Sequence, residues 1–368
     1  MEKVQVFFVS PVPFHALRQR HQGLAGEFLH HGFQVIFMDP LESPGFSVVQ
    51  NRIENHFHRV SVSVPFRAAR YPRLQEIAIK IAVKLLSKKK FWEPKNSILW
   101  IADPSMANIA NENWKTCFYD RCDRHGFFPG QNVNNWRYYE KRLFKRADQV
   151  FASSQTLLEE AENLVATGVH LLPNAASADW VDSSRPAGKK TGRSLSKNFA
   201  SFAPFCGIDR IKVVSSGAHY EWVDFSWLFM LAENDRIELH LAGTGRGESF
   251  DRLIRDPRVK WHSNLDRFNL KNLIDTCRVG VVPFRDIPLT HAVDPVKIYE
   301  YAARGLAIWT PNVAGIRNHP LVDSIVTDER SLAAALKSIP ETLRNSDRKN
   351  QIPTWADRFK TISPLLPP

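Results

Sequence analysis

The stretch from Asp294 to Gly305 constrains the fold of this chain most strongly, because both of its ends carry the signals of a short helix. Asp294 is a favourable N-cap, Pro295 suits the first helical position, and Gly305 suits the residue just past the C-terminus. Apolar runs occupy 280–284 before this stretch and 306–309 after it. The sequence therefore predicts a strand, a loop, a helix and a second strand, which is an α/β arrangement.

Two charged residues on the predicted helix, about 295–304, favour a ligand. Lys297 stands at its third position, where the helix macrodipole disfavours a cation, and Glu300 follows one turn later on the same face. Phosphates bound by Lys297 and by the free N–H groups of the first turn, with hydroxyls bound by Glu300, explain both residues. The alternative is an exposed ion pair on an ordinary helix, and spacing alone does not separate these two hypotheses.

Length and composition indicate a globular chain of two domains. Its 368 residues are 43% hydrophobic, and its net charge of +11 points to an anionic partner: nucleic acid, an acidic membrane face or phosphorylated substrates. The four cysteines form no CxxC pair, so neither a disulfide framework nor a zinc site is predicted. No long apolar run and no signal peptide are found in the sequence, and we expect a cytoplasmic protein.

The segment from Val281 to Gly305 resembles the donor-binding signature of bacterial GT-B glycosyltransferases. These enzymes build exopolysaccharides and other surface glycans, and the resemblance, to family 4-like or xanthan glucuronosyltransferase-like members, extends over most of the chain. It implies an α/β fold of two Rossmann-like domains that face each other across a cleft, with the acceptor on the first and a nucleotide sugar on the second. The expected parts are an acceptor domain 1–190, a polar linker 183–201, a donor domain 205–352, and a C-terminal helix 353–368 that packs back on the first domain.

The first strand and its loop predict part of the acceptor side. An apolar strand over 4–9 precedes a polar loop and a helical pattern, which is the start of a βαβ unit. The loop lies at the carboxyl edge of the sheet, where open α/β sheets bind ligands, so His15 and Arg20 are candidate contacts. Their alternative role is to cap the helix or to stay solvated. Asn174 matches a Pro-Asn step of the family near the cleft, and a turn role is the alternative.

Two aspartates are the candidate catalytic carboxylates. Asp120 ends a predicted strand and Asp123 lies in the following loop, in a segment that resembles the family's Tyr-Asp-x-x-Asp loop. We expect Asp123 to be the general base that accepts the proton of the acceptor hydroxyl, with Asp120 as its support or substitute. Flanking Arg121 and Arg124 are expected to lower the pKa of this carboxylate. Capping of the next turn is the alternative for both aspartates, and a general base favours inversion of the anomeric configuration.

The second half of the chain carries the candidate donor-binding residues. Gly217 ends a predicted strand and begins a segment that resembles the family's Gly-x-x-x-x-Trp-x-Asp entry to a helix. Its missing side chain lets a diphosphate approach the backbone. The resemblance implies that Lys297 and Gly217 stabilise the leaving nucleoside diphosphate and that Glu300 binds the ribose. Further donor contacts are expected from Tyr299, Arg285 and Thr290.

No metal ion and no cofactor are expected, because no DxD-like pair suits a divalent ion and the nucleotide sugar is itself a substrate. Two other functions are open. A nucleotide-sugar epimerase can share this fold, and it would turn over a nucleotide sugar without an acceptor. A non-catalytic basic module would bind an anionic surface with a steep salt dependence.

The segment 67–92 resembles a basic amphipathic helix of a membrane surface. Leu74, Ile77 and further apolar residues recur at helical spacing, and arginines and lysines run up to an aromatic pair, Phe91 and Trp92. We expect peripheral contact with the acidic inner face of the cell membrane and a lipid-linked glycan acceptor. The alternative is a domain helix with a solvated basic face. Nucleic acid is disfavoured, because no recognition motif accompanies the charge.

Overall fold

The computed structural model describes residues 4–16, 19–165, 168–181, 210–339 and 351–367, so the expected linker 183–201 lies outside the described residues. The chain divides into two compact units. The chain first leaves unit 1 and enters unit 2 between Ala175 and Ala176, which is 15 residues before the expected end of the acceptor domain at 190. Unit 1 consists of Met1–Ala175, Asp286–Val296 and Trp355–Pro368, and unit 2 of Ala176–Arg285 and Lys297–Thr354.

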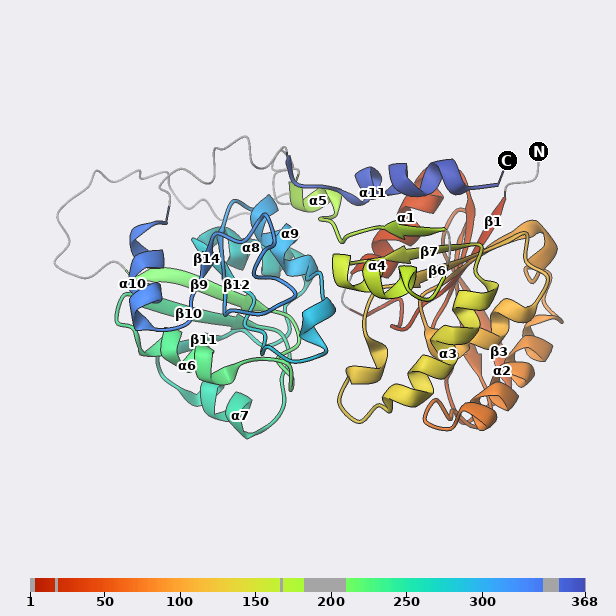
Figure 1. The fold of residues 1–368 in the computed structure, drawn as a ribbon, viewed down its shortest axis with the longest axis horizontal. Helices are drawn as coiled ribbons and strands as arrows, with labels where there is room; N and C mark the ends of the chain where they lie inside the picture. The colour runs from red at the N-terminus through yellow and green to blue at the C-terminus, as the bar shows by residue number, and fades with distance from the viewer. Residues whose placement is uncertain (1–3, 17–18, 166–167, 182–209, 340–350, 368) are drawn as a thin grey trace, which may run out of the picture. The chain divides into compact units, whose positions relative to one another are not determined.

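Unit 1 is built on an eight-stranded sheet in the order β3-β4-β2-β1-β5-β6-β7-β8, in which only β3 runs antiparallel to its neighbour (Figure 1). The central strands are apolar and buried on both faces, as expected of a sheet covered by helices on each side. The strands are β1 Gln5–Val9, β2 Gln34–Met38, β3 Ser47–Glu54, β4 Phe57–Ser63, β5 Ser97–Ile101, β6 Thr116–Arg121, β7 Gln149–Ala152 and β8 Val169–Leu171.

The helices of unit 1 cover both faces of this sheet. One apolar core contains side chains of α2 and α3, and the other contains side chains of α1 and α11. The C-terminal α11 packs on α1 (Figure 1), where a Cβ on Gly23 would lie 2.4 Å from the Trp355 indole nitrogen, so glycine is required for the close approach. The helices are α1 Arg20–His30, α2 Pro72–Leu86, α3 Val133–Arg146, α4 Gln155–Glu162 and α11 Trp355–Ile362.

Unit 2 is a six-stranded parallel sheet in the order β11-β10-β9-β12-β13-β14. The helix predicted over 295–304 is confirmed: α9 runs from Val296 to Ala303, and Gly305 beyond it has a φ of 73°. The other elements are β9 Ile211–Ser216, β10 Ile237–Ala242, β11 Val259–Trp261, β12 Val279–Val281, β13 Ala307–Thr310, β14 Ser324–Ile325, α5 Ala178–Val181, α6 Phe225–Glu233, α7 Glu248–Arg255, α8 Arg267–Thr276 and α10 Glu329–Lys337.

The segment Asp286–Val296, which we call the 286–296 segment, follows β12 in the sequence and ends at the first residue of α9, but it packs with unit 1. Ser154, the N-cap of α4, donates a hydrogen bond of 2.7 Å to the Ala292 carbonyl. Arg124 donates one of 2.6 Å to the Pro288 carbonyl. The parallel order of both sheets brings the carboxyl ends of their strands to one edge in each unit, which is where ligands bind in open α/β sheets.

Candidate active site

Asp120, in β6, is held in a buried ion pair. Its carboxylate is fully buried and accepts hydrogen bonds from Arg20 Nε at 2.9 Å and Nη2 at 2.6 Å, and from Trp100 Nε1 at 3.4 Å. Arg20 is the first residue of α1 and also donates to the Leu172 carbonyl at 2.8 Å. The pair joins α1, β6 and the end of β8. Such a buried carboxylate positions these elements, and its oxygens are occupied by protein donors.

Asp123 lies two residues beyond β6 and is partly exposed. Among the described residues, no donor forms a hydrogen bond with its carboxylate. Burial raises its pKa, an effect that His125 and Arg20 oppose and that Asp120 reinforces. A carboxylate with a raised pKa and free oxygens is suited to accept a proton.

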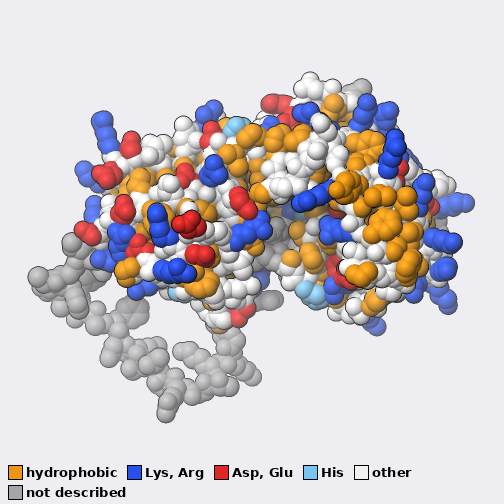
Figure 2. Space-filling view, turned by 90° about the horizontal axis from the view of Figure 1, so that it is seen from below, with side chains coloured by type: hydrophobic (Ala, Val, Ile, Leu, Met, Phe, Trp, Pro, Cys, Tyr) orange, Lys and Arg blue, Asp and Glu red, His pale blue; other side chains and the backbone are white. Residues whose placement is uncertain are grey.

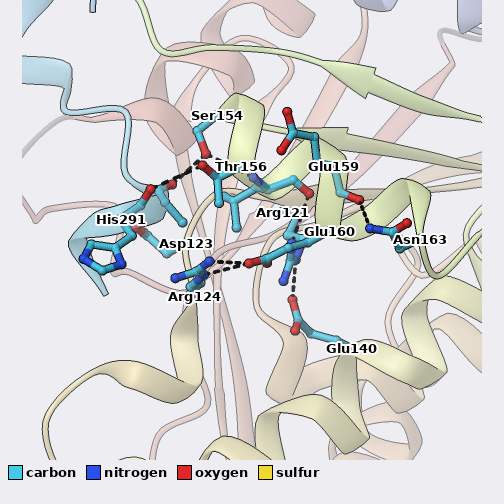
Figure 3. A network of polar contacts seen from close by, with 12 residues as sticks. Arg121, Asp123, Arg124, Glu140, Ser154, Thr156, Glu159, Glu160, Asn163 and His291 are labelled. Atoms are coloured by element: carbon cyan, nitrogen blue, oxygen red, sulfur yellow. Dashed lines mark hydrogen bonds and ion pairs between the residues drawn. The ribbon is translucent and has the colours of Figure 1, made fainter. Parts of the chain in front are cut away.

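The expectation that Arg121 and Arg124 lower the pKa of Asp123 is wrong, because both guanidinium groups bind other carboxylates. Arg121 donates to Glu140 at 2.8 Å and to Glu160 at 2.8 Å. Arg124 forms a short ion pair with Glu160 as well. Figure 3 shows this network beside Asp123 and the part of the 286–296 segment that carries His291. The two arginines therefore fix the loop after β6 to α4 and to the 286–296 segment.

The two remaining acceptor-side candidates, His15 and Asn174, differ in exposure and in hydrogen bonding. His15 is exposed, on a loop that is tied down where the Phe14 N–H donates to Asp39 Oδ1 at 2.8 Å. Asn174 is fully engaged: its side-chain amide donates to the Asp294 carbonyl, its backbone N–H donates to the Asp294 carboxylate, and its Oδ1 accepts from Arg20 at 3.3 Å. Asn174 therefore anchors the residues that lead into α9, whereas His15 is open to a ligand.

In unit 2 the structure brings together Lys297, Glu300 and Gly217. Lys297 Nζ lies 2.6 Å from Glu300 Oε2, and the side chains are 15% and 5% exposed. The alternative of an exposed ion pair is therefore wrong. A Cβ on Gly217, whose φ is 131°, would lie 3.7 Å from Lys297 Cε. Gly217, 80 positions before Lys297 in the sequence, thus meets the Lys297–Glu300 pair where the end of β9 lies against the first turn of α9.

The backbone around Gly217 is closely packed. A Cβ on Gly243, which follows β10 and has a φ of 117°, would lie 2.1 Å from the Gly217 carbonyl oxygen. The Ser216 N–H donates to the Tyr301 hydroxyl at 2.8 Å, which joins the end of β9 to α9. Glycine at both strand ends and the Tyr301 contact hold the Gly217 backbone next to the first turn of the helix.

The remaining donor-side candidates, Tyr299, Arg285 and Thr290, differ in burial and in the unit to which they belong. Tyr299 is buried, and its hydroxyl lies 3.3 Å from His319 Nε2. Arg285 is exposed and donates to the Glu221 carbonyl at 3.3 Å. Thr290 is buried in the 286–296 segment of unit 1, where its hydroxyl donates to the Ile287 carbonyl at 3.0 Å. Arg285 is therefore an exposed residue of unit 2, whereas Thr290 belongs to unit 1.

Comparisons with known proteins agree on one fold. No protein-family model matches the chain. The chain is 24% identical over 336 residues to TuaH of Bacillus subtilis (strain 168), which is named as a teichuronic acid biosynthesis glycosyltransferase. The match covers 85% of this chain and 73% of that protein. Sucrose-phosphate synthase from Thermosynechococcus elongatus superposes with a TM-score of 0.70 at 14% identity, over 99% of this chain and 98% of that chain. The chain has the GT-B fold.

Two further GT-B structures carry nucleotide ligands. The E. coli trehalose-6-phosphate structure bound with UDP-2-fluoro glucose matches with a TM-score of 0.65 at 11% identity, over 98% of each chain. Anabaena Alr3699/HepE in complex with UDP matches with a TM-score of 0.56 at 13% identity, over 99% of this chain and 95% of that one. The resemblance to GT-B glycosyltransferases of surface-glycan synthesis is confirmed, and the sheets of unit 1 and unit 2 are the two Rossmann-like domains of this fold.

Sequence reasoning missed three residues of this GT-B chain. Tyr301 looks like one more apolar position of α9, and Asp294 was read only as a helix cap, although it also receives the hydrogen bonds of Asn174. His21, the second residue of α1, is buried beside the Arg20–Asp120 pair and carries a ring nitrogen without a partner. Adjacency to Arg20 in a loop at the carboxyl edge was the one signal in the sequence that could have indicated His21.

Proposed function

We propose that the protein is a glycosyltransferase that moves a hexosyl group from a nucleoside-diphosphate sugar to a hydroxyl of a glycan acceptor in surface-polysaccharide synthesis. The observation that carries the proposal is the Lys297 cluster: a largely buried ammonium in the first turn of α9, against the glycine that ends β9. A helix N-terminus with a cation and a close backbone is suited to a diphosphate. The TuaH relative and the UDP-bearing GT-B structures support the same reaction class.

In the proposed reaction the acceptor oxygen attacks the anomeric carbon as the bond to the diphosphate breaks. The bonding electrons leave on the diphosphate, and Lys297 with the first-turn N–H groups of α9 stabilises this charge. Asp123 takes the proton from the acceptor hydroxyl, and the configuration inverts. Glu300 binds the ribose, with Tyr299 next to it. These groups supply the transition-state stabilisation themselves, so we expect activity to persist in excess EDTA.

A nucleotide screen tests this function directly. Purified protein is heated with UDP, GDP, CMP or dTDP, and one of them is expected to raise the melting temperature. At a concentration of about 100 times Kd, binding adds about 2.7 kcal/mol to the free energy of unfolding. The matching nucleotide sugar is then incubated with and without a glycan acceptor. Nucleotide release that needs the acceptor supports the transferase, whereas conversion of the sugar without acceptor supports the epimerase. Failure of all four nucleotides to bind refutes both.

The exposed face of α2 supports a second part of the proposal, peripheral association with an acidic membrane. The helix buries Gln75, Ala78 and three further residues against the core. This leaves Leu74 and Ile77 46% and 47% exposed, and Tyr71 just before the helix 65% exposed. A solvated domain helix would bury such side chains, so their exposure favours the membrane hypothesis.

Cationic side chains surround this exposed face. Figure 2 shows hydrophobic side chains gathered on the part of the molecule that carries α2 in Figure 1, with lysines and arginines along the edge. The aromatic pair after the helix was expected at this surface, but Phe91 is buried and Trp92 packs edge-on to Phe7 at 5.0 Å. Within the described ranges, no helix is both long and apolar enough to cross a bilayer. The exposed basic residues are Arg67, Arg70, Arg73, Lys80, Lys84, Lys88, Lys89 and Lys90.

Vesicle sedimentation tests this association. The protein is expected to sediment with vesicles that contain about a third phosphatidylglycerol and to stay in solution with neutral vesicles, because each basic residue near an acidic surface contributes about 1 kcal/mol. A Leu74→Ser/Ile77→Ser variant should lose most of this binding. Phe268→Ser, which alters a 52% exposed apolar side chain of unit 2, is the matched control and should bind as wild type does. Equal binding of all three proteins contradicts the assignment of this face.

A further inference from the structure

The 286–296 segment is held by its backbone to side chains of unit 1. Three side chains donate hydrogen bonds to carbonyls of this segment: Arg124 to Pro288 at 2.6 Å, Ser154 to Ala292 at 2.7 Å and Thr156 to His291 at 3.3 Å. The donors come from the loop after β6 and from the start of α4 (Figure 3). Bonds to carbonyls fix the path of the chain, so this part of unit 1 determines where the segment runs.

The same segment leads directly into the first turn of α9. Asp294 is anchored too, because its carbonyl accepts a hydrogen bond from the Asn174 amide. Val296, the first residue of α9, packs against the apolar core that contains side chains of α1 and α11, and the next residue, Lys297, belongs to unit 2. Three residues of extended chain span at most about 11 Å. Chain length alone therefore keeps the Lys297 Cα within about 11 Å of the Asp294 Cα.

Arg124 joins this segment to the candidate base. It follows Asp123 directly in the chain, and its guanidinium forms an ion pair with Glu160 of α4 while Nη1 binds the Pro288 carbonyl. The guanidinium also lies over the Phe127 ring, 5.7 Å from its centroid, and the side chain is only 17% exposed. A planar guanidinium can serve a carboxylate and a carbonyl at once in fixed directions, which a lysine ammonium on its flexible stem cannot.

The contribution of Arg124 is geometric rather than electrostatic. Its guanidinium is paired with a carboxylate of α4, so the two charges largely cancel at a distance. The pKa of Asp123 is raised by burial, an effect that His125 and Arg20 oppose and that Asp120 reinforces. Loss of the Arg124 contacts is therefore expected to move the base without changing its proton affinity.

We propose that Arg124 is a positioning residue, which holds the segment leading into α9 at a fixed distance from the loop that carries Asp123. This inference rests on the proposed glycosyl transfer, in which Asp123 takes the acceptor proton and Lys297 stabilises the leaving diphosphate. Both groups must be aligned at the moment of transfer, and a displacement of about 1 Å costs about 10²-fold in rate. Arg124 itself exchanges no proton and forms no bond with a substrate.

Two pairs of variants separate this role from a structural one. Arg124→Lys keeps a cation beside Glu160 but loses the fixed bond to Pro288, whereas Glu160→Gln removes the ion pair and keeps that bond. Ser154→Asp keeps the N-cap of α4 but cannot donate to Ala292, whereas Ser154→Thr does both. We expect Arg124→Lys and Ser154→Asp to lower kcat about 10- to 100-fold, and the other two to change it less than about 3-fold.

Two other quantities should stay constant. The nucleotide Kd should change less than about 3-fold in all four variants, because the Lys297 cluster lies in unit 2. In Arg124→Lys the acidic limb of kcat/KM should stay within about half a pH unit of wild type. Arg124→Lys and Ser154→Asp test the same segment independently, so the inference stays testable if one of them does not fold.

Four results overturn the inference. If kcat is unchanged in both Arg124→Lys and Ser154→Asp, the contacts are only structural. If kcat falls as much in Glu160→Gln as in Arg124→Lys, the ion pair matters and the bond to the segment does not. A weaker nucleotide affinity in Arg124→Lys assigns the residue to donor binding, and a displaced acidic limb assigns it to the charge of the base.

Hydrogen exchange of the 286–296 segment gives a readout that needs no turnover. The Thr290 N–H donates to the Ile287 carbonyl at 2.9 Å, so its exchange reports local opening of the segment. Exchange should be about 10-fold faster in Arg124→Lys than in wild type, and unchanged in Glu160→Gln. Faster exchange in a protein without transferase activity would support the holding contact and refute the proposed reaction. Unchanged exchange in an active enzyme would refute the positioning role alone.

Discussion

The Lys297–Glu300 pair allows a sharp test of whether the first turn of α9 acts on a ligand or only stabilises the fold. Lys297→Met leaves the 5% exposed Glu300 carboxylate without its partner. Removal of one member of a buried ion pair costs about 3–5 kcal/mol in the free energy of unfolding. Replacement of both members by uncharged residues of similar size, Lys297→Met with Glu300→Gln, is expected to restore stability to within about 1 kcal/mol, because no buried charge is then unpaired.

Activity should respond differently from stability. One preorganised charge at a developing anion contributes about 3–4 kcal/mol, so the single variant should lose about 10²- to 10³-fold in kcat/KM. The double variant, which also lacks the Glu300 carboxylate, should lose at least as much. The assays are urea denaturation for stability and nucleotide release with acceptor for kcat/KM. The matched control is the ion pair Lys360–Asp357 in α11, which has the same i,i+3 spacing at 2.8 Å but is exposed. Its double neutral variant should change neither quantity measurably.

The two hypotheses for the pair give opposite results for the double variant. If Lys297 meets the diphosphate, the double variant is stable and inactive. If the pair is only structural, the double variant recovers both stability and activity. Recovery of more than about a tenth of wild-type kcat/KM, which is less than about 1.4 kcal/mol of lost transition-state stabilisation, would refute the proposed mechanism.

Three further predictions concern the aspartate, the buried ion pair and a glycine. Burial raises the pKa of Asp123, so its negative charge opposes folding once the pH is above that pKa. Asp123→Asn should therefore raise the free energy of unfolding at pH 7 by about 1.4 kcal/mol per unit of pKa shift, with no gain at low pH. The same substitution should lower kcat at least about 10²-fold. In the wild type the acidic limb of kcat/KM should lie above the usual carboxyl pKa. Arg20→Met should cost about 3–5 kcal/mol in urea denaturation, and less when combined with Asp120→Asn. Gly243→Ala should reduce the nucleotide-induced thermal shift more than Gly247→Ala, since both have positive φ but only Gly243 lacks room for a Cβ.

Much of the fold could be predicted from local patterns. The helix α9 and its terminal Gly305 were predicted because a cap, a proline and a glycine act within a few residues of one another. The buried strands β1 and β6 were predicted because continuous apolar runs bounded by polar turns have few other uses in an α/β chain. The exposed antiparallel strand β3 was not predicted, since an edge strand with polar side chains on both faces has no such run.

The site depended more on contacts between distant parts of the chain. The sequence indicated which residue types cluster after strands, but not that Arg20 binds Asp120 from 100 positions away, which removes Asp120 from the candidate bases. It also indicated an amphipathic α2, but not which face is buried. The small Ala78 and Ala82 allow close packing on that face, and this leaves Leu74 exposed.

The sequence by itself determined the α/β class, the helix that holds Lys297 and the glycine that ends β9, because these depend on chain geometry within one or two turns. Only the tertiary structure decided that the Lys297–Glu300 pair is buried, that the pKa of Asp123 is raised, and that His21 Nδ1 lacks a partner. Burial and charge pairing depend on groups far apart in the chain, and no local pattern encodes how much water remains around a side chain once those groups have packed.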